Sequence, residues 1–148
     1  LRSKYAIIKQ KPLTKTNPKE TILMQRQAYT AIDVMSSGPY SHAIDAGEYI
    51  YVSGQTAKNS LTLEKQDLNI QEQTEECFKN INRILKELNL TEANVVKANV
   101  YLTGMKHFEG MNEVYKTKFT EPYPARTCVA VFELPLGADV EIEVVAKR

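Results

Sequence analysis

The segment that decides the fold is residues 69–102, with the sequence NIQEQTEECFKNINRILKELNLTEANVVKANVYL. Its first part carries apolar residues at helical spacing, which predicts an amphipathic helix over Ile70–Leu88. Asn69 followed by Glu72 is typical of a capped helix start, and Asn89 suits the left-handed backbone of a helix end. The apolar stripe consists of Cys77, Phe78, Ile81, Ile84, Leu85 and Leu88.

Strands are predicted on both sides of this helix, because runs of Val, Ile, Tyr and Thr are bounded by turn residues. Residues 55–68 are predicted to form a loop. A second helix, with apolar residues on one face, is predicted over His107–Phe119. The predicted strands are Tyr29–Ile32, Tyr40–Ile44, Tyr49–Ser53, Val95–Leu102, Ala125–Phe132 and Val140–Ala146.

Both predicted helices connect strands of one sheet. Crossovers between parallel strands are right-handed in about 98% of cases, so the two helices should lie on the same side. This predicts an α+β fold, a two-layer mixed sheet with two helices on one face. The other face has no cover, although the strands Val95–Leu102 and Ala125–Phe132 carry apolar or small residues on both faces. We therefore expect a homo-oligomer with any cleft between subunits.

The composition is that of one ordinary globular domain. The chain has 148 residues, 43% apolar and 25% charged. No apolar run approaches the roughly 18 residues of a membrane helix. Cys77 and Cys128 form no scaffold pattern and fit free thiols in a reducing compartment, which predicts a cytoplasmic protein.

Charge is distributed unevenly along the chain. Residues 1–23 hold six basic residues and one acid, whereas residues 24–148 hold 13 basic and 17 acidic residues. We expect a basic N-terminal extension followed by a single domain over 24–148. The extension has three interpretations: a mitochondrial or plastid transit segment, sequence upstream of a start at Met24, or an arm that docks on the acidic domain. The net negative charge of residues 24–148 gives no bulk attraction for phosphate backbones, which argues against nucleic acid as the main partner.

Common catalytic signatures are missing from the sequence, including phosphate-binding glycine loops and the nucleophile elbow. His42 and His107 stand at no metal-ligand spacing from each other or from a cysteine, so we expect no metal site.

Five segments together closely resemble the reactive intermediate deaminase family, also called Rid or YjgF-type proteins and the endoribonuclease L-PSP family. The resemblance covers about residues 28–147. The segments are SGPYS at 37–41, VSGQ at 52–55, MNEVY at 111–115, YPARTC at 123–128 and LPLGADVEIE at 134–143.

This resemblance implies a chorismate-mutase-like homotrimer with sites between subunits. It implies hydrolysis of reactive 2-enamine and 2-imino acids, such as 2-aminoacrylate, to a 2-keto acid and ammonia, without a cofactor. It places Arg126 as the carboxylate anchor and Glu141 as the residue that positions water. The implied substrate-binding residues of the cleft are Tyr40, Ser53, Asn112 and Cys128.

Side-chain chemistry agrees with some of these assignments. A guanidinium binds a carboxylate through two parallel hydrogen bonds, which suits Arg126; its other interpretation is a weak surface ion pair. Cys128 shares a strand face with Arg126. We expect it to line the cleft rather than act as a nucleophile, because no nearby base is evident. Tyr40, Ser53 and Asn112 have ordinary structural interpretations as well.

Glu141 raises a question of geometry. If the last two strands formed a tight hairpin, Glu141 would lie opposite about Val131, roughly 17 Å along the strand from Arg126. The two residues could then share a site only through another register or a second subunit. Two further functions stay open: an endoribonuclease or translation inhibitor, and a non-catalytic small-molecule-binding module.

Overall fold

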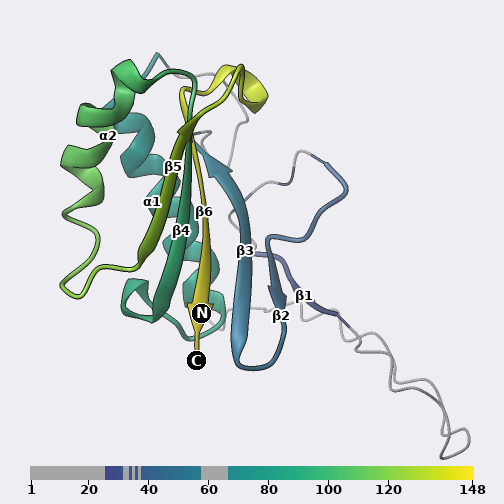
Figure 1. Cartoon of the computed structure of the whole chain (residues 1–148). Coiled ribbons are helices and arrows are strands. Elements are labelled where there is room, and N and C mark those ends of the chain that lie inside the picture. Colours follow the sequence, from purple (N-terminus) through teal and green to yellow (C-terminus); the bar gives the residue numbers. More distant parts are fainter. Residues whose placement is uncertain (1–25, 32–33, 35, 37, 58–66) are drawn as a thin grey trace, which may run out of the picture.

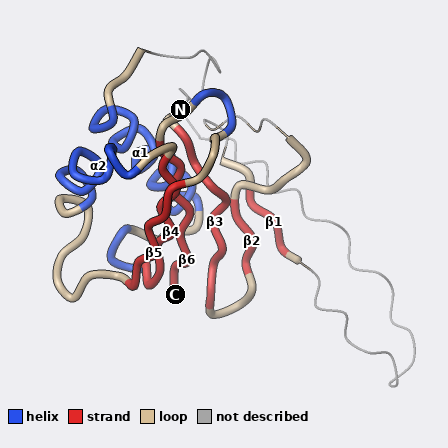
Figure 2. The backbone as a smooth tube through the Cα atoms, turned by 45° about the horizontal axis from the view of Figure 1, so that its top comes forward, coloured by secondary structure: helices blue, strands red, loops and turns tan. Residues whose placement is uncertain are grey.

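The computed structural model describes residues 26–31, 34, 36, 38–57 and 67–148. It confirms the α+β prediction: a mixed six-stranded sheet carries two helices on one face (Figures 1 and 2). The predicted extension over 1–23 lies outside the described residues. The elements are β1 (Gln27–Tyr29), β2 (Ala43–Asp45), β3 (Tyr49–Thr56), α1 (Ile70–Glu87), β4 (Val95–Leu102), α2 (Phe108–Tyr115), β5 (Ala125–Ala130) and β6 (Val140–Lys147).

The strand order is β1-β2-β3-β6-β4-β5, so the last strand of the chain lies in the interior of the sheet. β6 pairs antiparallel with both β3 and β4, and β5 pairs parallel with β4 at the edge. The tight hairpin between β5 and β6 that the sequence made conceivable is therefore not formed. Residues 131–139 instead carry the chain across β4 to the far side.

The core lies between the helices and one face of the sheet. The predicted stripe of α1 is confirmed, because all six of its residues are buried. Alternate residues of β4 and β6 are buried against the helices, as the two-residue period of a strand requires. These sheet residues are Ala98, Val100 and Leu102 of β4 and Val140, Ile142, Val144 and Ala146 of β6.

Both ends of α1 follow the sequence prediction. The side chain of Asn69 accepts a hydrogen bond from the Glu72 backbone, and the Glu72 carboxylate accepts one from the Asn69 backbone, at 2.9 Å each. At the other end Asn89 has φ of 57°, the left-handed conformation expected there.

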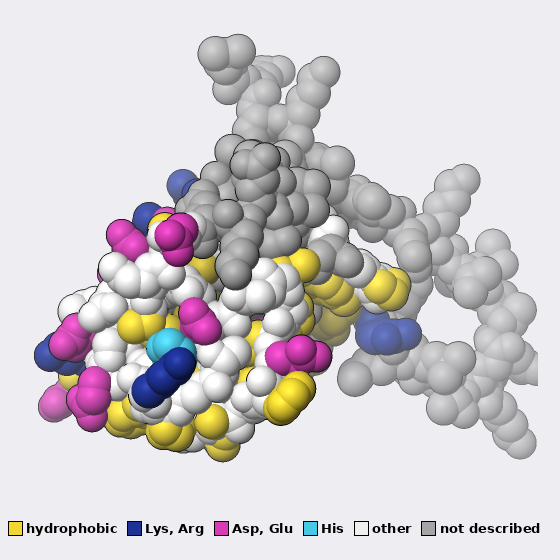
Figure 3. Space-filling view, turned by 90° about the horizontal axis from the view of Figure 1, so that it is seen from above, with side chains coloured by type: hydrophobic (Ala, Val, Ile, Leu, Met, Phe, Trp, Pro, Cys, Tyr) yellow, Lys and Arg dark blue, Asp and Glu magenta, His cyan; other side chains and the backbone are white. Residues whose placement is uncertain are grey.

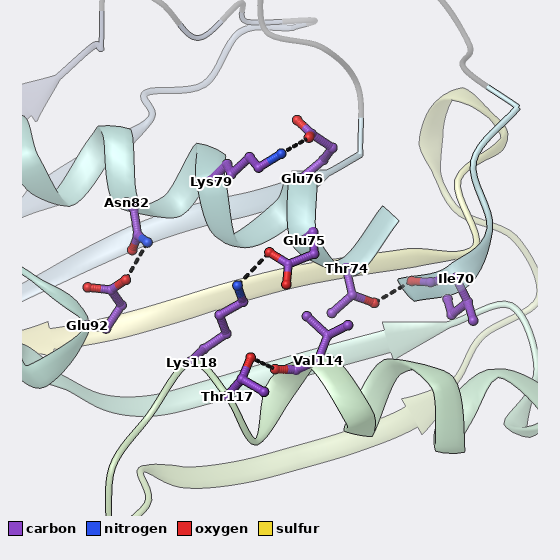
Figure 4. Close-up of polar contacts among 10 residues, drawn as sticks. All are labelled: Ile70, Thr74, Glu75, Glu76, Lys79, Asn82, Glu92, Val114, Thr117 and Lys118. Atoms are coloured by element: carbon purple, nitrogen blue, oxygen red, sulfur yellow. Dashed lines mark hydrogen bonds and ion pairs between the residues drawn. The ribbon is translucent and has the colours of Figure 1, made fainter. Parts of the chain in front are cut away.

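The two helices pack closely and are tied by polar contacts (Figure 4). Lys118, just after α2, forms an ion pair with Glu75 of α1. Gly110 allows the close approach, since a Cβ at this position would lie 2.6 Å from Ile70 Cγ2. No helix in the described ranges is long and apolar enough to span a membrane.

Several predicted boundaries are wrong in the helix and strand after β4. α2 starts at Phe108 and ends at Tyr115, four residues before the predicted end, and a separate 3₁₀ turn over Met105–His107 precedes it. β5 ends at Ala130 rather than Phe132, because the chain leaves the sheet and Phe132 is 97% exposed.

The strands nearest the N-terminus also differ from prediction. β1 and β2 are three residues each and are shifted from the predicted ranges, whereas β3 extends to Thr56, into the segment predicted as loop. β1 and β2 are peripheral, so few buried side chains mark their ends.

No described helix or strand covers the other face of the sheet (Figure 2). This open face is more polar than predicted. Asn99 and Tyr101 both donate to Glu143 Oε1, at 2.7 and 3.0 Å, and Lys97 donates to Thr127 Oγ1 at 2.7 Å. Exposed apolar side chains lie among these groups, including Tyr51 and Val129.

The capping box gives a direct test of the role of Asn69. We expect Asn69→Ala to lower the free energy of unfolding by about 1 kcal/mol, because the first turn of α1 loses a hydrogen-bond acceptor. Asn69→Asp keeps the acceptor and should retain the stability. Urea denaturation followed by circular dichroism measures both, and equal loss in the two variants would contradict the capping role.

Candidate functional site

Arg126 lies in a half-buried cluster between β5 and α2. Its Nη1 donates to Asn112 Oδ1 at 2.7 Å. Its guanidinium carbon lies 4.5 Å from the centre of the Tyr115 ring and 5.7 Å from that of Phe108. In the described part of the chain no carboxylate forms an ion pair with Arg126. The positive charge is thus held by neutral groups and stays available to an anion.

Cys128 lies on the same face of β5 as Arg126, as the sequence predicts, since the two pair with Ala98 and Val100 of β4. Burial raises the pKa of the Cys128 thiol, and the nearby Arg126 offsets this only in part. A raised pKa keeps the group protonated at neutral pH, which suits a wall residue better than a nucleophile.

Glu141 belongs to a second group, on the open face of the sheet. The register between β3 and β6 shifts between Val52 and Gln55, so that Ser53 and Gly54 form a bulge. A Cβ at Gly54 would overlap the Glu141 carboxylate. Glycine at this position lets the Glu141 carboxylate lie against the bulge. Bulges are common beside active sites.

The Glu141 carboxyl is electrostatically perturbed. Burial raises its pKa above the ordinary value, and the neighbouring Glu143 raises it further. Glu143 is held in place by Asn99 and Tyr101, whereas no hydrogen bond satisfies Glu141 within the described residues. A half-buried carboxyl that has a raised pKa and no hydrogen-bond partner in the described residues is chemically suited to proton transfer.

Ser53 and Tyr40 extend the second group toward β2. Ser53 Oγ donates to the Ser41 carbonyl at 2.7 Å, which joins the bulge to the segment that carries Tyr40. The Tyr40 side chain is 42% exposed, with its ring 6.2 Å from that of His42. In this structure the Ser53 hydroxyl thus satisfies a backbone carbonyl of the neighbouring segment.

The six predicted residues therefore fall into two groups that do not meet within one chain. Arg126 pairs with Ala98, on the helix face, and Glu141 pairs with Tyr101, on the open face. By this register the two residues are about 10 Å apart along the strands and about 10 Å across them. The observed strand register, which replaces the tight hairpin considered above, thus leaves Arg126 and Glu141 on opposite faces of the sheet.

Sequence reasoning missed three residues of these groups: Phe108, Tyr115 and Gly54. The spacing of Phe108 and Tyr115 marked them as an apolar helix face, and nothing in that pattern distinguishes a residue beneath a guanidinium from one in the core. Gly54 stood inside a motif, but its role depends on the bulge, which alternation of side chains does not reveal.

Other features lie outside the two groups. A hollow of about 690 Å³ at one end of the sheet is lined by residues 132–139 and Thr103, and none of the six predicted residues lines it. Figure 3 looks down on the molecule from above and shows charged side chains of both signs and a histidine among hydrophobic ones. Among the residues described, no three His, Cys, Asp or Glu group closely enough to hold a metal ion.

Known proteins are similar to this chain in sequence and fold. A 2-iminobutanoate/2-iminopropanoate deaminase from Dermatophagoides farinae is 37% identical over 106 residues, covering 72% of this chain and 83% of the relative. Protein MMF1, mitochondrial, from Saccharomyces cerevisiae is 41% identical over 111 residues, covering 75% and 76%. The crystal structure of RidA from the Antarctic bacterium Psychrobacter sp. PAMC 21119 is 35% identical, with a TM-score of 0.77 over 84% of this chain and 100% of that one.

The fold and the motif positions define a Rid-type α+β domain. The model of the family described as Endoribonuclease L-PSP matches residues 30–148, and the chain belongs to this family, also known as YjgF/RutC/Rid. The family resemblance seen in the sequence is thereby confirmed.

The charge of Glu143 gives a test of the environment of Glu141. We expect Glu143→Gln to lower the pKa of Glu141, because removing a negative neighbour makes loss of the proton easier. The pKa should stay above the ordinary value, since burial is the larger cause. NMR titration of labelled glutamate side chains measures it, with Glu113→Gln on the exposed side of α2 as the control. An unchanged Glu141 pKa in Glu143→Gln would contradict the coupling.

Proposed function

We propose that this protein is a cofactor-independent deaminase that hydrolyses reactive 2-imino and 2-enamino acids to 2-keto acids and ammonia. The observation that carries the proposal is the Arg126 guanidinium, half-buried and free of any acidic partner in the described residues. Each substrate of this class carries a carboxylate that matches the guanidinium. The deaminase name of the Dermatophagoides farinae relative supports the same chemistry.

The reaction asks little of the protein. A protonated imine is already electrophilic at its C2 carbon, so a positioned water and a proton acceptor suffice. In the proposed mechanism Arg126 binds the substrate carboxylate and Glu141 orients the water and accepts its proton. The new C–O bond gives a tetrahedral carbinolamine. Glu141 then returns the proton to the amino group, and the C–N bond breaks as the hydroxyl loses its proton to the departing ammonia and the C2 carbonyl forms. Cys128, Asn112, Tyr40 and Ser53 complete the cleft.

The position of Arg126 and Glu141 requires more than one copy of the chain in this mechanism. Arg126 lies on the helix face, at one edge of the sheet, and Glu141 lies on the open face. The two side chains can therefore meet only if they come from two copies of the chain. An interface in which two different surfaces meet is heterologous, and it forms a closed ring when the rotation between neighbouring copies closes. We propose a homotrimer with three sites, each between neighbouring subunits.

A second function follows from the description of the family model, which names an endoribonuclease. RNA binding that survives removal of residues 1–23 and weakens with salt would favour it over the deaminase. A third candidate, a binding module without turnover, would bind 2-keto acids but would not accelerate imine decay.

Two destinations in the cell stay open for the protein, the cytoplasm and an organelle. The mitochondrial name of the yeast relative, together with the basic residues 1–23, favours the organelle. We propose residues 24–148 as the working domain in either case.

The anchor role of Arg126 predicts a large effect on turnover. We expect Arg126→Ala to lower kcat/KM for 2-iminobutanoate about 30–1,000-fold, because a charge-assisted contact to a bound carboxylate is lost. The assay follows the decay of the imino acid made in situ by an amino-acid oxidase. Arg148→Ala, which removes a paired surface arginine, is the control and should leave the rate unchanged. Full activity in Arg126→Ala would contradict the anchor.

A mixed oligomer tests whether two chains build one site. Arg126→Ala and Glu141→Ala are co-expressed with different tags, and assemblies that carry both tags are purified. Each mixed trimer contains one junction where intact Arg126 meets intact Glu141, so we expect about a third of the wild-type rate from two inactive variants. Single-variant trimers are the controls. An inactive mixed assembly, or a monomer in light scattering at micromolar concentration, would contradict the shared site.

A further inference from the structure

The support beneath Arg126 comes from one face of α2. Phe108, Asn112 and Tyr115 stand at i, i+4 and i+7, which places them in one row along a helix. Asn112 accepts the hydrogen bond from Nη1 at 2.7 Å, and the Tyr115 ring lies 4.5 Å beneath the guanidinium carbon. The arginine is thus fixed by one directional contact in its plane and by one contact on its flat side.

This support is electrically neutral. Asn112 offers a carbonyl oxygen where an aspartate of the same shape would offer a carboxylate, and the aromatic face attracts a cation without neutralising it. Four of the five guanidinium N–H donors have no hydrogen-bond partner in the described residues. The arginine keeps both its charge and a fork of donors for a ligand.

Tyr115 is anchored in the core. It is 4% exposed, and its ring packs against Phe78 and Phe119 at centroid distances of 5.8 and 5.1 Å. Its hydroxyl is buried and forms no hydrogen bond in the part of the chain that the structure describes. The contact with Arg126 therefore depends on the ring rather than on the hydroxyl.

We propose that Asn112 and Tyr115 are positioning residues, which hold the Arg126 guanidinium oriented and uncompensated so that it binds the carboxylate of a 2-keto or 2-imino acid. The inference deepens the proposed function and rests on it for the class of ligand. It changes the role of Asn112 from a residue that binds substrate to one that acts through Arg126. It gives Tyr115 a role that the sequence motifs did not assign.

The deciding variant is Asn112→Asp, which keeps the shape and adds a carboxylate beside Nη1. An internal ion pair should then compete with the ligand, and we expect the affinity for 2-oxobutanoate, measured by calorimetry, to fall about 10–100-fold. The melting temperature should stay the same or rise, because the new pair forms within the fold. A residue that only stabilises the structure would not move affinity and stability in opposite directions. Asn89→Asp adds the same charge on a distant turn and should bind as the wild type does.

The aromatic support is tested by a pair of variants. Tyr115→Phe keeps the ring and should retain the wild-type affinity, whereas Tyr115→Leu removes the face and should weaken binding about 3–30-fold. Since Tyr115→Leu also disturbs the core, Tyr115→Phe and Asn112→Asp keep the test independent of folding.

The outcomes separate this inference from the proposed reaction. Unchanged 2-oxobutanoate affinity in Asn112→Asp would overturn the positioning role, and so would a wild-type protein that binds no 2-oxobutanoate. If the wild type binds the keto acid, Asn112→Asp loses it and neither accelerates imine decay, the positioning role stands and the deaminase proposal fails.

Discussion

The position of β6 in the sheet is the constraint on which the rest of the structure depends. Its residues alternate between the core and the open face, so that burial of Val140, Ile142 and Val144 also sets the direction of Glu141 and Glu143. A slip of one residue would expose three apolar side chains and bury two carboxylates, which is far too costly to occur. Hydrophobic burial thus fixes the register of β6, and this register determines the positions of Glu141 and Glu143.

The same placement leaves β5 at the edge, paired only with β4. Arg126 then faces α2, at a boundary between helix and sheet, while Glu141 faces the uncovered side. No rotation of side chains brings two groups together through a packed sheet. A reaction that needs both residues must therefore be an activity of the assembly, and an open face with mixed polar and apolar groups is well suited to contact with another copy.

The sequence was sufficient for the parts of the fold that depend on local pattern. The cap at Asn69 and the buried stripe of α1 involve residues close in the chain, and both are confirmed. The sequence was insufficient for the order of strands, because alternation in β6 shows which residues are buried but not which strand lies beside it. The bulge at Gly54 and the contact of Arg126 with Tyr115 depend on that order, so neither was predicted. The motif residues were found by resemblance, and their division between two faces came only from the structure.

The charged groups of the described residues differ in how they are compensated. Lys118, Lys147 and Arg148 each form an ion pair with a nearby carboxylate. Arg126 is half-buried, and the described residues offer it only an amide oxygen and aromatic rings. Partial burial of an uncompensated cation lowers the stability of the folded chain, so stability alone gives no reason for it. Glu141 carries the opposite charge in a comparable state: it is half-buried, its pKa is raised, and it forms no hydrogen bond with the residues that the structure describes. A zwitterionic intermediate with a carboxylate at one end and a protonated imine at the other is a ligand that would relieve both costs at once.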